Sequence, residues 1–494
     1  MKFYKALIIT LAVSYLLTSC FEDNDDNIIQ ASEINDFVWK GMNTFYLYKE
    51  NVSNLANDRF TSDAEYADYL NDFSSPEQLF ESLIYERQTF DRFSWITDNY
   101  FENEALLNGR TLTNGMQFTI MRRSDTDPVR YGIVLYVLPG SSADIQGLKR
   151  GDIFYAVNGS DLYYNSPSDN NYSLFDSVTY SIDLGTYNTN GTPELDDDSV
   201  TSLGESVSLT KEDFTENPIH VNKVLDVGGK KIGYLMYTGF NGSSSELNNV
   251  FATFKSAGVT ELVLDLRYNS GGFNSKAILM SSLITGQFTG DVLIKKYFNN
   301  ELQTIFEDQD PDFLIDKFIN NEDGMSLNSL NLNKVYALTT VWSASASELV
   351  INCLKPYIDV IQIGTNTSGK YQGSFTLYDS PDFTKDGVNP NHTYAIQPLI
   401  FKYANIDDKT DFFDGLEPDI FLGETRTNLG ILGDENEPLL AEAIGNITGT
   451  GKFINQKGQN TIESDNLEPI NSIKGKLIDD RKIPKHITNR LIFE

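Results

Sequence analysis

The alternation of strand-like and helix-like segments between Lys230 and about Leu422 constrains the fold more than any other feature of the sequence. The strand-like run KKIGYLMYTGF precedes the helical pattern SSELNNVFATFKSAG, and the buried run ELVLDLR precedes the helical pattern NSKAILMSSLIT. The runs KVYALTT, SASELVINCLK and VIQIGTN continue the same order. Such alternation favours an α/β core with a largely parallel sheet.

The remaining sequence divides into regions of different pattern, and 494 residues exceed what one hydrophobic core usually organises. Residues 33–110 have apolar positions at helical spacing, as in SEINDFVWKGMNTFYLYKE and SPEQLFESLIYE. Residues 111–225 turn to short strands, with an acidic, Asn-rich insertion that carries the hairpin signal Asn190-Gly191. We therefore predict a multidomain α/β protein with a helical N-terminal domain (33–110), a β-rich domain (111–225), the α/β core (226–425), and a C-terminal helix and tail (426–494).

The first twenty residues, MKFYKALIITLAVSYLLTSC, have the features of an export signal. Lys2 and Lys5 precede an apolar run that is short for a membrane span, so residues 1–19 are predicted to be a signal peptide. The end of the run resembles the bacterial lipobox, which implies that Cys20 is acylated; an ordinary signal peptide with an incidental cysteine is the alternative. Residues 20–32 would form an acidic tether similar to the export signal of Bacteroidetes-type surface lipoproteins. We expect an exported protein, lipid-anchored to the outer membrane on its periplasmic face or at the cell surface.

The charge balance narrows the choice of partners. The chain has 38 Lys and Arg against 70 Asp and Glu, a net charge of −32, which repels phosphate backbones and anionic head groups. This argues against nucleic-acid binding and leaves the lipid as the expected membrane contact. If Cys20 is acylated, Cys353 has no intramolecular disulfide partner and is expected to be a buried thiol. The three histidines are scattered, so the sequence predicts no metal site, no cofactor and few options for a histidine base.

The run DIQGLKRGDIFYAVNG, within the predicted β-rich domain, resembles the most recognisable stretch of bacterial PDZ domains. The resemblance implies that a peptide end binds by strand addition beside MQFTI, with the backbone amides near Gly115 and Met116 meeting a terminal carboxylate. The peptide-binding residues would be Gly115, Met116, Gln117 and Phe118. A β-rich packing domain that binds nothing is the alternative.

Three short runs in the α/β region contain the residues that could take part in catalysis. The first, LVLDLRYNSGG, is a buried strand that ends in a polar turn at Asp265, Arg267 and Asn269. Gly271 and Gly272 follow, and glycines there let backbone N–H groups point into a cleft at the start of a helix. A steric need for glycine at a strand-to-helix turn would explain the pair equally well.

The second run, VWSASASELV, places small residues between a strand and a helix. A serine at such a helix start is exposed to substrate, and the amide of the next residue can point at an oxyanion. Ser343, Ser345 and Ser347 could instead be simple N-caps.

The third run, IGTNTSGKYQG, is a strand followed by a turn that ends at Lys370. A lysine in a partly apolar cleft loses hydration of its ammonium group, so the neutral amine can accept a proton from a serine hydroxyl. Ser/Lys pairs of this kind need no histidine. A surface lysine is the alternative.

The order of the three runs, DLRxNxGG, SASASE and TxxGK, resembles the C-terminal processing (tail-specific) serine peptidases, which carry a PDZ domain. In that family the nucleophile lies three positions before the glutamate and the lysine lies 25 residues after the serine, as Ser345 and Lys370 do here. The resemblance spans about Gly115 to Asp419. It implies a ClpP/crotonase-like core and a serine endopeptidase that cleaves exported or extracellular proteins through an acyl-enzyme, with the PDZ-like domain binding substrate C-terminal tails.

The resemblance also suggests the remaining site residues. The amides of Ala346 and Gly271 would hold the oxyanion, with Gly272 as the next candidate. The family often has a glutamine four residues after the lysine that orients it, whereas this chain has Ser374 there. Glu348, Gln372 and Ser374 are the candidates for that orienting role.

Two other classes of function compete with the peptidase. The segment from Gly364 to Lys370 matches the spacing of a phosphate-binding P-loop, but Tyr371 follows where a P-loop needs Ser or Thr, and YQGSFTLYD reads as extended rather than helical. A catalytically inactive peptide-binding lipoprotein on the same fold is the second rival. No carboxylate pair with glycosidase spacing is recognisable.

Overall fold

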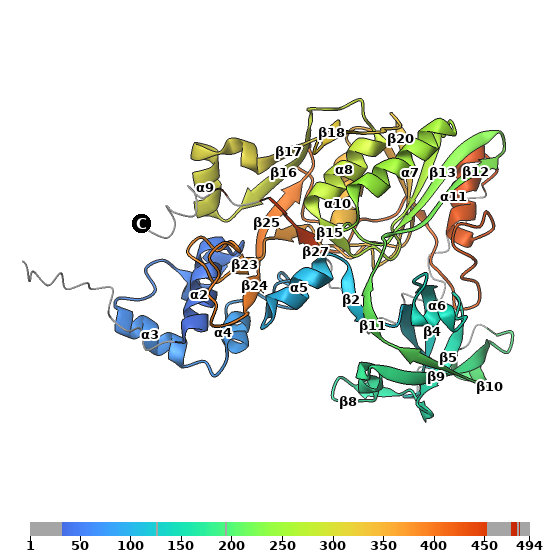
Figure 1. Ribbon diagram of the computed structural model, residues 1–494, viewed down its shortest axis with the longest axis horizontal. Coiled ribbons are helices and arrows are strands. Elements are labelled where there is room, and N and C mark those ends of the chain that lie inside the picture. The colour runs from blue at the N-terminus through green and yellow to red at the C-terminus, as the bar shows by residue number, and fades with distance from the viewer. Residues whose placement is uncertain (1–31, 125–126, 193–194, 452–475, 482–483, 485–494) are drawn as a thin grey trace, which may run out of the picture.

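The computed structural model describes residues 32–124, 127–192, 195–451, 476–481 and 484. A helical region, a β-rich domain and a large α/β core are visible in Figure 1, with the β-rich domain below the core and the helical region beside it. The predicted signal peptide and the acylation site at Cys20 lie outside the described residues. Within those residues, no helix has both the length and the apolar character needed to span a bilayer.

The N-terminal region is helical, as its apolar spacing predicts. Ser62 and Ser75 begin two of its helices by accepting hydrogen bonds from the amides three residues on, and Pro76 occupies the first helical position. Its short strand β1 pairs antiparallel with β24 of the core, so this region is joined to the core by a sheet. The elements are α2 (Glu33–Phe45), α3 (Asp63–Asn71), α4 (Pro76–Ser82), β1 (Trp95–Thr97), α5 (Tyr100–Leu107) and, in the core, β23 (Leu377–Tyr378) and β24 (Ala395–Gln397).

Helix α2 shares one hydrophobic cluster with the core. Phe37, Val38, Met42 and Phe45 are at most 3% exposed and belong to the same cluster as Ile396 of β24. Burying one such side chain stabilises the folded state by about 1.5–3 kcal/mol. The helical region is therefore packed onto the core rather than built around a separate one.

The β-rich domain contains a sheet with the strand order β10-β9-β5-β4-β3, so β3 lies at its edge. The predicted hairpin signal is confirmed, because Asn190 and Gly191 have positive φ angles in the turn between β9 and β10. The elements are β3 (Met116–Arg122), β4 (Arg130–Val137), α6 (Ser142–Ile145), β5 (Ile153–Val157), β6 (Ser160–Asp161), β7 (Tyr164–Ser166), β8 (Asp169–Asn170), β9 (Thr179–Asn188) and β10 (Ser199–Thr210). Strands β2 (Arg110–Thr113) and β11 (Glu212–Thr215) pair with each other where the chain enters and leaves the domain.

The central sheet of the core has the order β12-β13-β14-β20-β21-β26 and is parallel at every pair except β12/β13, as the alternating sequence predicts. Alternate residues of β13 face opposite layers: Leu235 packs toward α7, α8 and α10, while Tyr234 packs toward α11. The elements are β12 (Ile219–Val227), β13 (Lys230–Tyr237), α7 (Ser244–Ser256), β14 (Glu261–Asp265), α8 (Asn274–Ile284), β20 (Lys334–Thr339), α10 (Ala346–Leu354), β21 (Asp359–Gly364), β26 (Ile420–Phe421) and α11 (Pro438–Thr448).

A second six-stranded sheet, which the sequence did not predict, has the order β15-β27-β22-β25-β16-β17 and mixes parallel with antiparallel pairs. One of its inner strands, β27, comes from the C-terminal tail. Its elements are β15 (Gly271–Phe273), β16 (Val292–Phe298), β17 (Ile315–Lys317), β22 (Gln372–Ser374), β25 (Leu399–Ala404) and β27 (Lys476–Ile478). Helix α9 (Asn300–Gln309) and the short hairpin β18 (Asn321–Glu322) and β19 (Met325–Ser326) lie between its strands in the chain.

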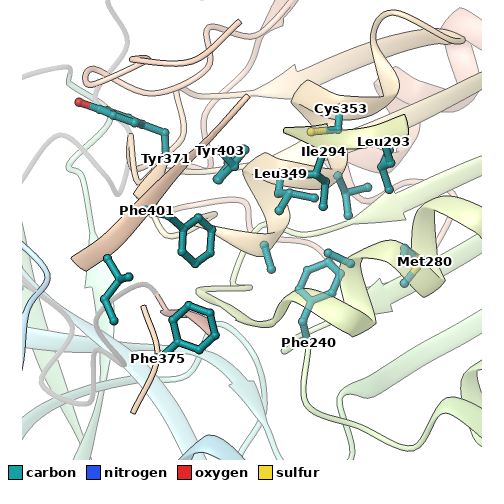
Figure 2. Close-up of a cluster of buried hydrophobic side chains, with 14 of the residues drawn as sticks. Phe240, Met280, Leu293, Ile294, Leu349, Cys353, Tyr371, Phe375, Phe401 and Tyr403 are labelled. Carbon is teal, nitrogen blue, oxygen red and sulfur yellow. The ribbon is translucent and has the colours of Figure 1, made fainter. Parts of the chain in front are cut away.

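Helix α10 joins the two sheets through an apolar layer (Figure 2). Leu349 and Cys353 of α10 and Phe401 and Tyr403 of β25 belong to one cluster and are fully buried. Cys353 is the buried free thiol that the sequence predicts, and burial raises its pKa. The position of α10 is therefore set by close packing on both sides.

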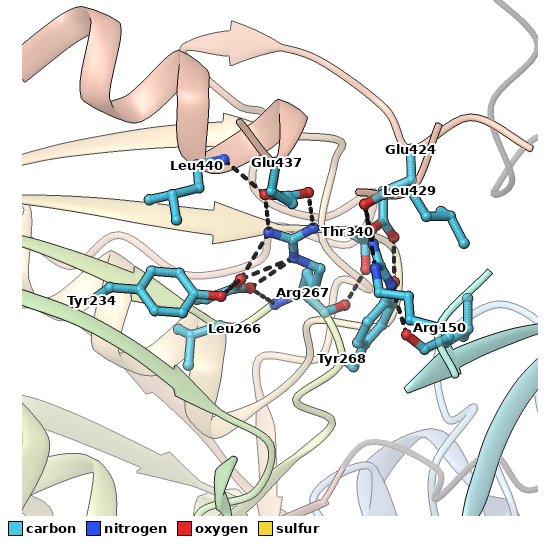
Figure 3. Close-up of polar contacts among 12 residues, drawn as sticks. Arg150, Tyr234, Leu266, Arg267, Tyr268, Thr340, Glu424, Leu429, Glu437 and Leu440 are labelled. Atoms are coloured by element: carbon cyan, nitrogen blue, oxygen red, sulfur yellow. Dashed lines mark hydrogen bonds and ion pairs between the residues drawn. The ribbon is translucent and has the colours of Figure 1, made fainter. Parts of the chain in front are cut away.

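A buried ionic cluster attaches the β-rich domain to the core (Figure 3). Arg267 is fully buried and contacts the carboxylates of Asp265, Glu424 and Glu437. Arg150, which belongs to the β-rich domain, forms an ion pair with Glu424. It also donates a hydrogen bond of 2.6 Å to the hydroxyl of Tyr268. Although burial opposes ionisation, the two arginines hold the pKa of Glu424 below its usual value.

Candidate active site

The structure places Ser345 between the end of β20 and the start of α10, with a backbone conformation that is unusual for serine. Its φ and ψ angles are 62° and −110°. A non-glycine residue held in such a sparsely populated region costs roughly 1–3 kcal/mol, and strain of this kind is concentrated at functional sites. The Ser345 hydroxyl is buried and has no hydrogen-bond partner among the described residues. A strained strand-to-helix turn of this type presents the side chain of a nucleophile.

Glu348 connects Ser345 to Lys370. Its Oε2 atom accepts hydrogen bonds from the amide of Ser345 at 2.6 Å and from the amide of Lys370 at 2.9 Å. Its Oε1 atom accepts from the Thr367 hydroxyl at 2.6 Å and from the Gly369 amide at 2.7 Å. Burial raises the pKa of Glu348, and these four donors oppose the rise. One carboxylate oxygen therefore bridges the backbones of the two residues that the sequence singled out.

Lys370 is fully buried, and residues of the N-terminal region help to enclose it. Its Nζ atom lies 5.1 Å from the centre of the Phe93 ring. Arg92 donates to the carbonyl oxygens of Ser368 at 3.3 Å and Gly369 at 3.1 Å, which holds the loop before the lysine. Gly369 has a φ of 83°, and a Cβ atom there would come within 1.9 Å of the Phe413 carbonyl oxygen, so this position requires glycine.

The sequence missed the contributions of Arg92 and Phe93. They lie more than 270 residues before Lys370 in the chain, and the runs around them contain none of the three motifs. Thr367 and Asn269 lie inside the motifs, but their positioning contacts depend on the three-dimensional arrangement.

Asn269 forms hydrogen bonds with both the turn that contains Gly271 and the turn that contains Ser345. Its carbonyl oxygen accepts from the Ala344 amide at 3.0 Å and from the Ser347 hydroxyl at 2.9 Å. Its side-chain oxygen accepts from the Gly271 amide at 2.9 Å. The Gly271 amide, one of the predicted oxyanion donors, is therefore already bonded in this structure.

The other two predicted oxyanion donors, Ala346 and Gly272, differ from each other in their surroundings. Ala346 is the first residue of α10, so its amide has no acceptor within the helix and lies in the positive field of the helix N-terminus. Gly272 has a φ of 147°, and a Cβ atom there would lie 2.5 Å from the Phe240 carbonyl oxygen. The backbone at Gly272 thus approaches its neighbour so closely that only glycine fits.

The three candidates for orienting Lys370 differ in what they contact. Glu348 holds the lysine backbone, as described above. The Gln372 side chain donates 2.9 Å to the Tyr48 hydroxyl, and its oxygen is buried without a hydrogen-bond partner among the described residues. Ser374 is buried, and its carbonyl oxygen accepts from the Asp479 amide at 3.0 Å.

The predicted peptide-binding residues lie in the β-rich domain, apart from this site. Strand β3 is the last strand of its sheet among the described residues, and strand addition requires such an edge. The amide of Gly115 donates to the Thr113 hydroxyl at 3.0 Å, and the amide of Met116 donates to the Asn114 side chain at 3.1 Å. A terminal carboxylate would have to replace these two bonds. Gln117 is half-buried, and Phe118 packs into the hydrophobic cluster of the domain.

The structure does not support the P-loop reading. Strand β22 begins two residues after Lys370, where a P-loop would begin a helix. Among the described residues, no group of three or more His, Cys, Asp or Glu side chains could hold a metal ion.

Comparison with known proteins matches two parts of the chain that contribute to this site to one peptidase family. Residues 231–422 match the model of peptidase family S41, and residues 33–95 match the peptidase S41 N-terminal domain. A solved protein from Bacteroides fragilis that is assigned to the S41 proteases has 23% identity and a TM-score of 0.64, over 84% of this chain and 98% of that one. The photosystem II D1 C-terminal processing protease has 18% identity and a TM-score of 0.46, over 86% of this chain and 100% of that one. The chain belongs to peptidase family S41 and is a serine-type peptidase.

Proposed function

We propose that the chain is an endopeptidase in which Ser345 is the nucleophile and Lys370 the general base. The observation that carries this proposal is the bridge made by Glu348, one oxygen of which accepts hydrogen bonds from the amides of both residues. The strained backbone of Ser345 and the burial of Lys370 support it. Burial removes water from the amine and favours its neutral form, which is the form that accepts a proton.

The reaction would proceed through an acyl-enzyme. The Lys370 amine takes the proton of the Ser345 hydroxyl as the oxygen attacks the peptide carbonyl carbon. The carbonyl oxygen becomes an oxyanion, which the amides of Ala346 and Gly272 stabilise. When the C–N bond breaks, Lys370 gives its proton to the leaving amine. Water then attacks the ester, with Lys370 as base, and Ser345 regains its proton.

Substrate recognition and location complete the proposal. The free edge of β3 would bind substrate C-terminal tails in the way of a PDZ domain, and the substrates would be exported or extracellular proteins. The lipobox-like run supports lipid attachment at Cys20 and a place at the outer membrane.

The test compares Ser345→Ala and Lys370→Met with the unchanged chain in the cleavage of an unstructured protein. Each substitution should lower kcat by a factor of about 10³ or more, because members of such constellations act as a unit. Ser256→Ala and Lys255→Met, at the exposed end of α7, are the matched controls and should retain full activity. Near-normal cleavage by either site variant would show that the assignment is wrong.

The same variants separate an enzyme from an inactive binder. A serine-reactive acylating probe should label the unchanged chain and the Ser256→Ala control but not Ser345→Ala. If the unchanged chain neither reacts with the probe nor cleaves protein, the peptide-binding rival accounts for the fold better.

A further inference from the structure

The C-terminal strand β27 lies between the two segments that form the proposed site. It pairs in parallel with β15, where Gly272 faces Leu477, and with β22, where Ser374 faces Ile478. Strand β15 carries the glycine pair, and β22 begins two residues after Lys370. Figure 1 shows β27 near the middle of the molecule, beside β15 and α5.

The tail lies on the side toward which the backbone groups of Gly272 point. The Phe240 amide donates to the Gly271 carbonyl oxygen at 2.9 Å, and the Phe273 amide donates to the Phe240 carbonyl oxygen at 2.7 Å. Because backbone groups alternate sides along an extended strand, the N–H and C=O of Gly272 face away from Phe240 and toward β27. The tail strand thus occupies the side that the proposed oxyanion donor faces.

A small pocket of about 50 Å³ adjoins this strand pair, and Ile478 of the tail forms part of its wall together with Gly271, Gly272 and Phe273. Ile478 is only 4% exposed. Ser345 and Lys370 are fully buried, so no peptide reaches them in this arrangement. A segment near the site has to move before a substrate can bind.

Side chains hold the tail in place. Asp479 pairs with the fully buried Lys296, which also contacts Asp316 at 2.8 Å. The Arg481 guanidinium contacts Asp479 at 2.9 Å and lies 4.2 Å from the centre of the Phe313 ring. Asp480 accepts from the backbone and hydroxyl of Ser275 in the first turn of α8. These contacts favour an apolar residue followed by two acidic residues, which is the order of Ile478, Asp479 and Asp480 in the tail.

We propose that residues 476–481 are an autoinhibitory strand that occupies the position of an extended substrate peptide between β15 and β22. The inference rests on the proposed function, because it takes the glycine strand and the segment after Lys370 as the walls of the substrate cleft. A substrate displaces the tail and pairs with the same two strands. The contacts of the tail indicate its preferred class: an extended segment with an apolar residue in the place of Ile478 and a carboxylate beside Lys296.

A reversible cross-link tests the displacement. Phe273 and Ile478 are paired in register, and neighbouring strands lie about 4.8 Å apart, within the range of a disulfide. The full chain with Phe273→Cys and Ile478→Cys should lose at least about nine-tenths of its cleavage of an unstructured protein when oxidised, because the fraction of molecules with an open cleft limits binding. Reductant should restore it. Each single cysteine variant is the control and should respond to neither treatment.

Equal cleavage by the oxidised and reduced forms would overturn the proposal, since β27 would then be a permanent structural strand. A second measurement needs no catalysis and uses Ser345→Ala as the background. In the variant Ser345→Ala/Asp479→Lys, Lys296 repels the chain's own tail. A fluorescent peptide of residues 474–483 should therefore bind this variant at least about tenfold more tightly than it binds Ser345→Ala. The same peptide with the Asp479→Lys change should not bind.

The two measurements separate this inference from the function on which it rests. If the peptide binds the tail-displaced variant while no form of the chain cleaves protein, the strand position is correct and the peptidase assignment is wrong. If the peptide binds neither variant, the strand position is wrong whether or not the chain is a peptidase.

Discussion

The β-rich domain and the C-terminal strand are both attached to the core by buried ion pairs. The two attachments differ in the charges that would remain buried in the core if the element were released. Arg150 enters a cluster in which Arg267 already contacts Asp265, Glu424 and Glu437. The tail brings Asp479 and Arg481 to a pair that the core already contains, Lys296 and Asp316.

Charge balance distinguishes the two clusters. With Arg150 in place, the first cluster has two cations and three carboxylates, and without it a single arginine remains for three carboxylates. The second cluster is neutral with the tail bound, and it separates into two neutral pairs when the tail leaves. Uncompensated buried charge is expensive, so release of the tail costs less than release of the β-rich domain. The comparison identifies the tail as the more readily displaced of the two elements.

The largest effect is expected for Arg267→Met. The substitution leaves Asp265, Glu424 and Glu437 buried with one cation, and breaking such a cluster typically destabilises a protein by about 3–5 kcal/mol. The free energy of unfolding from urea denaturation measures the loss. Arg110→Met removes an exposed ion pair with Asp213 between β2 and β11 and is the control, with no measurable change expected. A loss as small as that of the control would show that Arg267 does not compensate the three buried carboxylates.

A smaller effect is expected for Arg150→Met, because Glu424 keeps its contacts with Arg267 and Tyr268. Loss of the charged hydrogen bonds of Arg150 should lower the free energy of unfolding by about 1.5–3 kcal/mol. Limited proteolysis should also cut the chain faster near β2 and β11, where it enters and leaves the β-rich domain. If Arg150→Met proved as destabilising as Arg267→Met, the two arginines would contribute equally to the stability of the cluster, in contradiction to the expected order.

The smallest effect concerns the tail and depends on pH. Burial opposes the ionisation of Asp479, but Lys296 and Arg481 lower its pKa to about 2. A carboxyl group with a lowered pKa stabilises the bound tail above its ordinary pKa of about 3.9, and this contribution is lost as the pH falls toward 2. The shift corresponds to about 2–3 kcal/mol of tail binding.

A fluorophore on Lys482→Cys should therefore report release of the tail in a transition centred near pH 2. The same labelled chain with Asp479→Asn should show no transition in that range, since it has no proton to gain. A transition centred at the ordinary pKa of an aspartate would show that Lys296 and Arg481 do not hold the carboxylate.

The three motifs could be located from the sequence because each lies at the end of a strand, and such patterns are local. The strand ELVLDLR, the helix after Ser345 and the extended run after Lys370 all appear as expected. The parallel order of the central sheet follows from the same alternation. The pairing of Ser345 with Lys370 came from the resemblance of the ordered motifs to the C-terminal processing peptidases, in which the lysine lies 25 residues after the serine.

The second sheet could not be predicted, because four of its six strands have only three residues and its members come from distant parts of the chain. Strand β27 has three residues and pairs with segments more than 100 residues earlier, so neither its length nor its neighbours give a periodic signal. The same limit applies to Arg92 and Phe93, whose contacts with the lysine loop depend on how the helical region packs. The Gly271 amide also differs from expectation, because the Asn269 side chain binds it in an Asx turn, a local pattern that competes with the predicted oxyanion role.

The contact between Phe93 and Lys370 has a practical consequence for protein engineering. A recombinant fragment limited to residues 231–422 would leave the amine without its aromatic neighbour and the preceding loop without Arg92. Bulk water would then reach the Lys370 amine, which is fully buried in the intact chain. A chimera that exchanges peptidase modules between relatives must therefore carry the matching segment around residue 92, or the proposed base will lose the side chains that enclose it.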